Sequence, residues 1–153
     1  MKKKFEGQLI SRYPLEDWPY YPLPQNLMTF MFSSGIWAEK EDPKVSISPQ
    51  FFSFTLTNEE GSWVYVSVLS LKENPLDPSL EIPLKAFNIV NPKEIVIPKA
   101  LVIISHYSFI NNCKEFLKSL YSVHLSKSIL PLERYITNFV DEIPRPDKGN
   151  LCV

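Results

Sequence analysis

The sequence has few of the residues that build catalytic and metal centres. Its 153 residues include two histidines, two cysteines and four glycines. Two cysteines are too few for a disulfide framework or a cysteine-rich metal site, and two histidines give little material for a metal centre or a catalytic triad. The nucleotide-binding signatures GxGxxG and GxxxxGK[ST] do not occur. The sequence therefore predicts no cofactor, no metal ion and no covalent catalysis.

Charge and hydropathy argue against three further classes of protein. Sixteen Lys and Arg residues against seventeen Asp and Glu residues give a formal net charge of -1, so no basic field is present for nucleic acid. The longest apolar run, near residues 100–104, is too short to span a membrane. The basic start, residues 2–4, is followed by Phe5-Glu6-Gly7 and not by the apolar run of a signal peptide. These features predict one cytoplasmic domain with a core of its own.

Proline, in contrast, is abundant, with fourteen residues, many of which lie in the stretches 12–24 and 74–98. Proline fixes φ and removes a hydrogen-bond donor, so neither stretch is a helix or a central strand. Residues 19–22 match the PxxP pattern of ligands for proline-binding domains. The alternative, which we favour because disordered ligand segments are poor in aromatic residues, is an extended connector whose aromatic rings pack onto the domain. Those rings belong to Trp18, Tyr20 and Tyr21.

Three strand patterns follow along the chain. Residues 27–32 are apolar on both alternating faces, which predicts an interior strand. Two segments rich in aromatic and β-branched residues follow, 51–57 and 62–71. The turn between them, 58–61, ends in Gly61, which is able to adopt a positive φ. Together they predict a β-hairpin. Residues 99–105 form a continuous apolar run, typical of a strand covered on both sides.

Two helix patterns complete the chain. Apolar residues recur at spacings of three and four over 110–124 and again over 132–143, where Pro131 suits the first helical position and Pro144 ends the helix. The first stripe predicts Cys113 in the core and His124 packed on or beside the apolar face. The sequence thus predicts an α/β sandwich that contains an antiparallel hairpin, a further strand and two packed helices.

Four segments resemble a known family. Residues 98–109, PKALVIISHYSF, resemble the PKALCLLSHYPF signature of the upstream DENN (uDENN) module, and residues 131–144 resemble its following motif. Residues 51–65 resemble its FFSFVLTDEDGxxxYG hairpin, and residues 27–35 its FCFPxG strand. The four motifs occur in the family's order over about residues 8–153. Departures at Ser33-Ser34, Val66 and Ser108 loosen the subfamily assignment, and the family's usual first strand is missing before Phe5.

The resemblance implies a fold of class α/β (α+β), a longin-like sheet with an antiparallel hairpin and two C-terminal helices packed on it. We expect residues 1–26 to form a proline- and aromatic-rich segment packed on the domain, and residues 27–153 to form the longin-like uDENN module. Family members continue into central and downstream DENN lobes, and these lobes are expected to be absent from this chain. The chain is therefore expected to be either a fragment or a free-standing module.

The resemblance further implies the N-terminal lobe of a guanine-nucleotide exchange factor for Rab GTPases in membrane trafficking, inactive without the remaining lobes. The expected partners are a Rab GTPase and the DENN lobes, with no nucleic acid and no transmembrane segment. A cytoplasmic location is expected, and peripheral recruitment to endomembranes stays open. The alternative is a non-catalytic longin-like adaptor or scaffold module.

A partner-binding surface is predicted on the second helix and its exit. The spacing commits Tyr135 and Phe139 to the core, which leaves the polar positions of this segment facing outward. The resemblance includes residues 132–135 as a motif, and the planar guanidinium of an arginine suits carboxylates at an interface. A merely solvated helix face is the alternative. The candidate residues are Glu133, Arg134, Asn138, Asp141 and Arg145.

Overall fold

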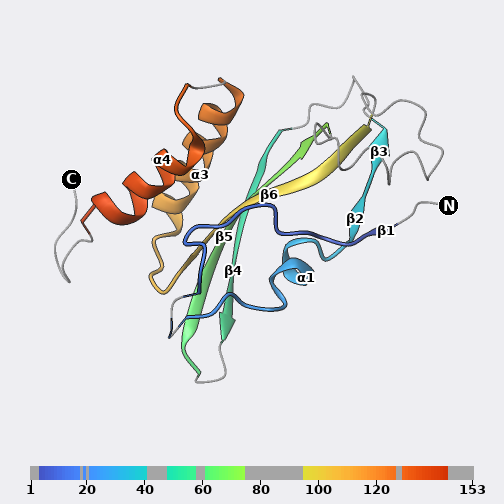
Figure 1. Ribbon diagram of the computed structural model, residues 1–153. Helices are drawn as coiled ribbons and strands as arrows, with labels where there is room; N and C mark the ends of the chain where they lie inside the picture. The colour runs from blue at the N-terminus through green and yellow to red at the C-terminus, as the bar shows by residue number, and fades with distance from the viewer. Residues whose placement is uncertain are drawn as a thin grey trace.

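The fold is built on a meander of three antiparallel strands (Figure 1). In this computed structural model, β4 (Gln50–Thr57) pairs with β5 (Trp63–Glu73), and β5 pairs with β6 (Ile95–Ser105). β-branched and aromatic residues are frequent in these runs, as expected of pleated, half-buried backbone. Gly61 has φ 80°, so the glycine takes the left-handed conformation that the turn requires. The predicted hairpin is confirmed.

The structure describes residues 4–17, 19, 21–40, 48–57, 61–74, 95–126 and 129–144. Within these ranges the sheet gains a short edge strand, β3 (Glu39–Lys40), which pairs with the start of β6 and gives the order β3-β6-β5-β4. A separate two-stranded sheet joins β1 (Lys4–Phe5) to β2 (Ile36–Trp37). All the described pairings are antiparallel.

One face of the meander is covered by the N-terminal part of the chain. Val66 and Val68 are 0% exposed on this face and form the core with Leu27, while Leu23 and Met31 pack against them. Alternating side chains of β4 and β6 complete this layer, because successive residues of a strand point to opposite faces. They are Phe52, Phe54, Leu56, Ala100, Val102 and Ile104.

The segment 27–32 is a helix and not the predicted strand. In α1 (Leu27–Met31), Thr29 N donates to Asn26 O at 3.1 Å at the start of the helix, and Phe32 N donates to Met28 O at 3.0 Å at its end. A short run that is apolar at nearly every position fits both periods, so its pattern does not separate a helix from a strand. The helix places Leu27 and Met31, four residues apart, on the sheet.

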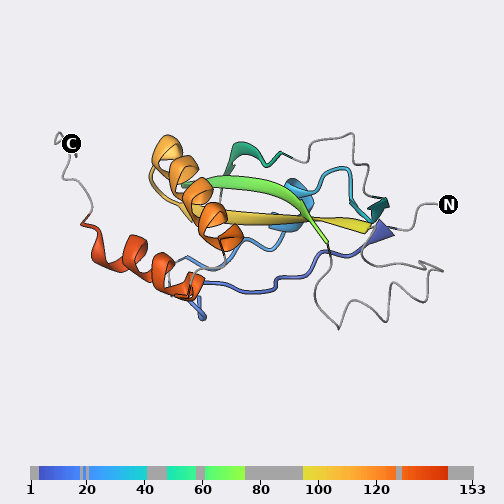
Figure 2. The same cartoon turned by 90° about the horizontal axis from the view of Figure 1, so that it is seen from above.

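The other face of the sheet is covered by α3 (Ile110–Leu125), as Figure 2 shows, with the N-terminal segment on the opposite side. Cys113, Leu117 and Leu120 are buried at spacings of four and three, which confirms the predicted stripe. β6 is buried at Ile95 and Val96 and half-buried from there on, less than predicted. The reason is that β3 protects only the first two residues of its outer edge.

The last two elements form a layer on α3. α4 (Leu132–Thr137) continues as a π-helical turn, η2 (Asn138–Glu142), and Ile143 leaves it in an extended conformation before Pro144. The ring of Phe139 stacks on Phe116 of α3, with centroids 3.8 Å apart and planes 10° apart. No residue of α4 or η2 is buried. The predicted fold class, a mixed α/β fold with a hairpin and two C-terminal helices, is confirmed.

Candidate partner-binding surface

The exposed side of α4 and η2 holds a small network of charged and polar groups. Arg134, 61% exposed, reaches from α4 to η2, where its Nη2 lies 3.4 Å from Oε1 of Glu142. The other carboxylate oxygen of Glu142 accepts a hydrogen bond from Nδ2 of Asn138. The carboxylate therefore neutralises Arg134 and orients Asn138. We call Glu133, Arg134, Asn138 and Glu142 the helix surface.

The structure places the five predicted residues in three different situations. Arg134 and Asn138 come together through Glu142, and Glu133 is exposed one residue before Arg134. Asp141 instead accepts a hydrogen bond from the hydroxyl of Tyr13, 128 residues away in sequence. Arg145 lies outside the described residues. Asp141 is thus exposed but already hydrogen-bonded within the domain, so we do not count it in the helix surface.

Tyr13 belongs to an extended segment, residues 12–23, that we call the strap; residues 18 and 20 of it lie outside the described ranges. Because its hydroxyl donates to the Asp141 carboxylate, the pKa of Tyr13 is raised above its usual value of 10.0. The strap thereby connects the N-terminal part of the chain to η2. Sequence spacing offered no signal for this contact, because the two residues come from opposite ends of the chain.

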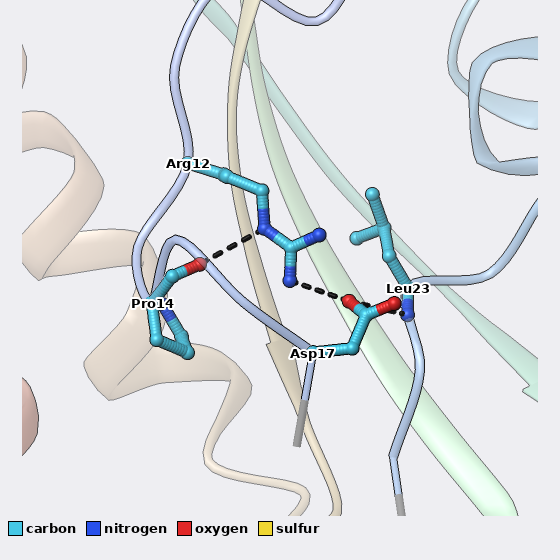
Figure 3. A network of polar contacts seen from close by, with 4 residues as sticks. All are labelled: Arg12, Pro14, Asp17 and Leu23. Carbon is cyan, nitrogen blue, oxygen red and sulfur yellow. Dashed lines mark hydrogen bonds and ion pairs between the residues drawn. The ribbon is translucent and has the colours of Figure 1, made fainter. Parts of the chain in front are cut away.

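Asp17 and Arg12 hold the strap in its turn (Figure 3). Arg12 donates from Nε to the carbonyl of Pro14 at 2.9 Å and from Nη2 to Oδ1 of Asp17 at 2.5 Å. The same carboxylate oxygen accepts from the backbone N of Leu23 at 3.3 Å. The hydrogen bond from Arg12 lowers the pKa of Asp17. One ion pair therefore fixes both ends of the turn.

The strap also packs on the end of β6. The Tyr21 ring lies 3.9 Å from the His106 ring, between centroids, at an interplanar angle of 44°. Trp18 and Tyr20, the other two rings predicted to pack, lie outside the described residues. His106, a half-buried residue, is thus in contact with an aromatic ring of the strap.

The second histidine, predicted to pack on or beside the apolar face of its helix, lies at the edge of that face. His124 is 41% exposed at the end of α3, and its Nε2 lies 3.1 Å from Oε1 of Glu73, whose other oxygen lies 3.1 Å from Nζ of Lys99. Position 124 falls at the edge of the apolar stripe, where the side chain reaches a carboxylate at the end of β5. This cluster connects α3 to the far end of the hairpin.

Cys113 is buried between α3 and the sheet, as predicted. Burial raises the pKa of its thiol, although a hydrogen bond with the Ser67 side chain acts in the opposite direction. Cys152 lies outside the described residues. Among the described residues, no three His, Cys, Asp or Glu side chains are grouped so as to hold a metal ion.

Two family models match the chain in succession. The model of the uDENN domain matches residues 7–71, and the model of the DENN (AEX-3) domain matches residues 96–153. No solved structure matches the chain. The first match ends within β5 and the second begins within β6, and these strands are neighbours from Tyr65↔Ser105 to Glu73↔Ile97. The two matched segments therefore share one sheet. In the part of the chain that the structure describes, no helix is long and apolar enough to cross a membrane.

Proposed function

The chain belongs to the DENN-domain family, and on that premise we propose that it acts as the N-terminal uDENN lobe of a guanine-nucleotide exchange factor for Rab GTPases. Domains of this family are associated with Rab exchange. In this proposal residues 27–153 form one longin-like module with residues 1–26 packed on it. The module contributes to GTPase binding and needs the remaining DENN lobes for exchange.

Nucleotide exchange needs no covalent chemistry from the exchange factor. It needs a surface that binds the nucleotide-free GTPase more tightly than the loaded one, because an effector shifts an equilibrium only by its differential affinity. Such a surface holds the switch segments of the GTPase in an arrangement that weakens its contacts with nucleotide and Mg²⁺. We propose that the helix surface contributes to this binding, or to the junction with the following DENN lobe.

The observation that supports the proposal most is the order and position of the two matches. A uDENN match is followed by a DENN match, and β5 and β6 connect them within one sheet. The geometry of the helix surface agrees with a role in binding, since Arg134 and Glu142 are both exposed and present a cation and a carboxylate side by side.

We further propose that the protein works on endomembranes as a peripheral protein.

Binding to a panel of Rab GTPases tests the proposal. We expect at least one Rab to bind the chain about tenfold or more tightly without nucleotide than with GDP, a difference typical of coupled sites. Release of fluorescent GDP should be slow with this chain and faster once the remaining DENN lobes are supplied. No binding to any Rab in any state would refute the proposal. Equal binding in every nucleotide state would favour the adaptor alternative.

Arg134→Glu tests the part played by the helix surface. It should weaken binding to the nucleotide-free Rab, or to the DENN lobes, because it reverses the charge offered to the partner. The matched control is Lys118→Glu, which reverses another exposed cation that is likewise paired with a glutamate, Glu115, at 3.2 Å on α3. If both variants weaken binding equally, the effect comes from net charge and the helix surface is the wrong site.

A further inference from the structure

The outer edge of β4 differs from the other edge of the sheet. β4 pairs with β5 on one side, and across the described residues no strand pairs with its other side. The sequence of β4, QFFSFTLT, contains no charged residue and no proline over eight positions. The opposite edge carries Glu39 and Lys40 in β3, and Pro98 and Lys99 in β6. Charges and prolines are devices by which proteins prevent pairing at an edge strand, and β4 has neither.

An aromatic cluster lies beside the same edge. The Phe54 ring is 5.9 Å from that of Phe30 and 6.3 Å from that of Phe52, between centroids. Phe52 and Phe54 are half-buried, and Phe30, on α1, is 53% exposed. A strand added to β4 would cover these rings while satisfying the outward backbone groups of β4.

The pattern of β4 is complementary to itself. A two-fold axis perpendicular to the sheet makes two β4 strands antiparallel and keeps each side chain on its own face. With this axis at Phe54, Phe54 lies opposite its own copy and Phe52 lies opposite Leu56, so apolar residues meet on the core face. Ser53 then lies opposite Thr55 on the α3 side of the sheet, where both of these side chains are exposed. An axis at Ser53 would instead place Gln50 opposite Leu56.

The nearby charge does not oppose this arrangement. Nζ of Lys114 lies 5.6 Å from the centre of the Phe51 ring, on the face that α3 covers. With the axis at Phe54, the two Phe51 residues are six positions apart along the strands, which is about 20 Å. That separation exceeds the screening length of about 8 Å at physiological ionic strength, so the two lysines repel weakly.

We propose that a second copy of this chain pairs with the outer edge of β4, about a two-fold axis at Phe54, so that the sheet continues from one copy into the other. The added strand is β4 of the second copy, because β4 carries no charge and its alternating apolar residues match those of the edge and of the aromatic cluster. The inference is independent of the proposed exchange function, since it involves no GTPase.

Two double variants test both the contact and its register. Ser53 and Thr55 are exposed in the single chain, so substitutions there should leave its fold intact. Ser53→Lys with Thr55→Lys places like charges opposite each other at both symmetric positions, whereas Ser53→Lys with Thr55→Glu places opposite charges there. Sedimentation velocity over a concentration series should give a dimer dissociation constant about tenfold or more weaker for the lysine–lysine variant. The difference between the dissociation constants of the two variants should decrease at high salt, because salt screens the introduced charges.

The wild-type protein provides a second measurement that needs no substitution. Hydrogen exchange in β4 should slow as the protein concentration rises, while exchange in β5 stays the same. A wild-type chain that stays monomeric at its highest soluble concentration, with exchange independent of concentration, overturns the proposal. Equal self-association of the two variants overturns the register. Thermal melts of dilute samples confirm that both variants are folded, and if either is unfolded the exchange measurement decides.

Discussion

The stacked pair of Phe116 and Phe139 should determine how firmly α4 and η2 are held. The rings lie face to face at 3.8 Å, yet both side chains are only half-buried. Truncation of a fully buried Phe to Ala costs about 3–5 kcal/mol, so half burial predicts about 1.5–2.5 kcal/mol for either variant. The ring contact itself contributes about 0.5–1.5 kcal/mol. The double variant should therefore lose less than the two single losses together, by about that amount.

Urea unfolding followed by far-UV circular dichroism measures these losses, and Val140→Ala is the matched control. Val140 lies next to Phe139 and is 48% exposed, so its truncation should cost less than about 0.5 kcal/mol. Hydrogen exchange adds a local test, because Phe139→Ala should remove protection from α4 while β5 keeps its own. Strictly additive losses, or a Phe139→Ala variant no less stable than Val140→Ala, would refute the argument that the ring stack holds this layer.

Three further predictions follow from the strap, the hairpin turn and the helix surface. Arg134→Glu should shift the melting temperature by no more than a few degrees, because exposed ion pairs contribute about 0–1 kcal/mol; an unfolded variant would mean that Arg134 clamps the fold. Gly61→Ala should cost about 1–2 kcal/mol in urea melts, because Gly61 has φ 80° and an added Cβ meets no atom of the described residues within 4 Å, so that backbone strain is what opposes it; Gly61→Asn should cost less. The pKa of Tyr13 is raised in the folded state, so its bond to Asp141 contributes fully below pH 10.0 and is lost as pH rises through the folded pKa. The pKa of Asp17 is lowered, so its pair with Arg12 contributes fully above pH 3.8 and is lost as pH falls through the folded pKa. An NMR titration should show an alkaline step at Tyr13 and an acidic step at Asp17, and Tyr13→Phe should remove the Tyr13 step while the acidic step remains.

The parts of the fold that the sequence predicted correctly are those with long, unambiguous periods. The hairpin combined two β-rich runs with a glycine at the required position, and α3 repeated its apolar stripe over four turns. α1 was wrongly assigned because five apolar residues in six fit either period, and only the sheet beneath Leu27 and Met31 selects the helix. Similarly, the predicted burial of the second helix was too high, since the periodicity of a stripe does not indicate how deeply it is covered.

In the candidate site, too, the sequence indicates contacts at helical spacing but not contacts between distant segments. Glu142 follows Asn138 by four residues, so helical spacing alone would have found this pair. No spacing rule connects Tyr13 to Asp141, because that contact depends on how the strap crosses the sheet and where η2 ends. Asp141 is exposed like Glu142, but its carboxylate is hydrogen-bonded to Tyr13 of the strap. Arg134 and Glu142 are therefore exposed to a partner, whereas the exposed carboxylate of Asp141 already accepts a hydrogen bond from Tyr13 of the strap, with which a partner would compete.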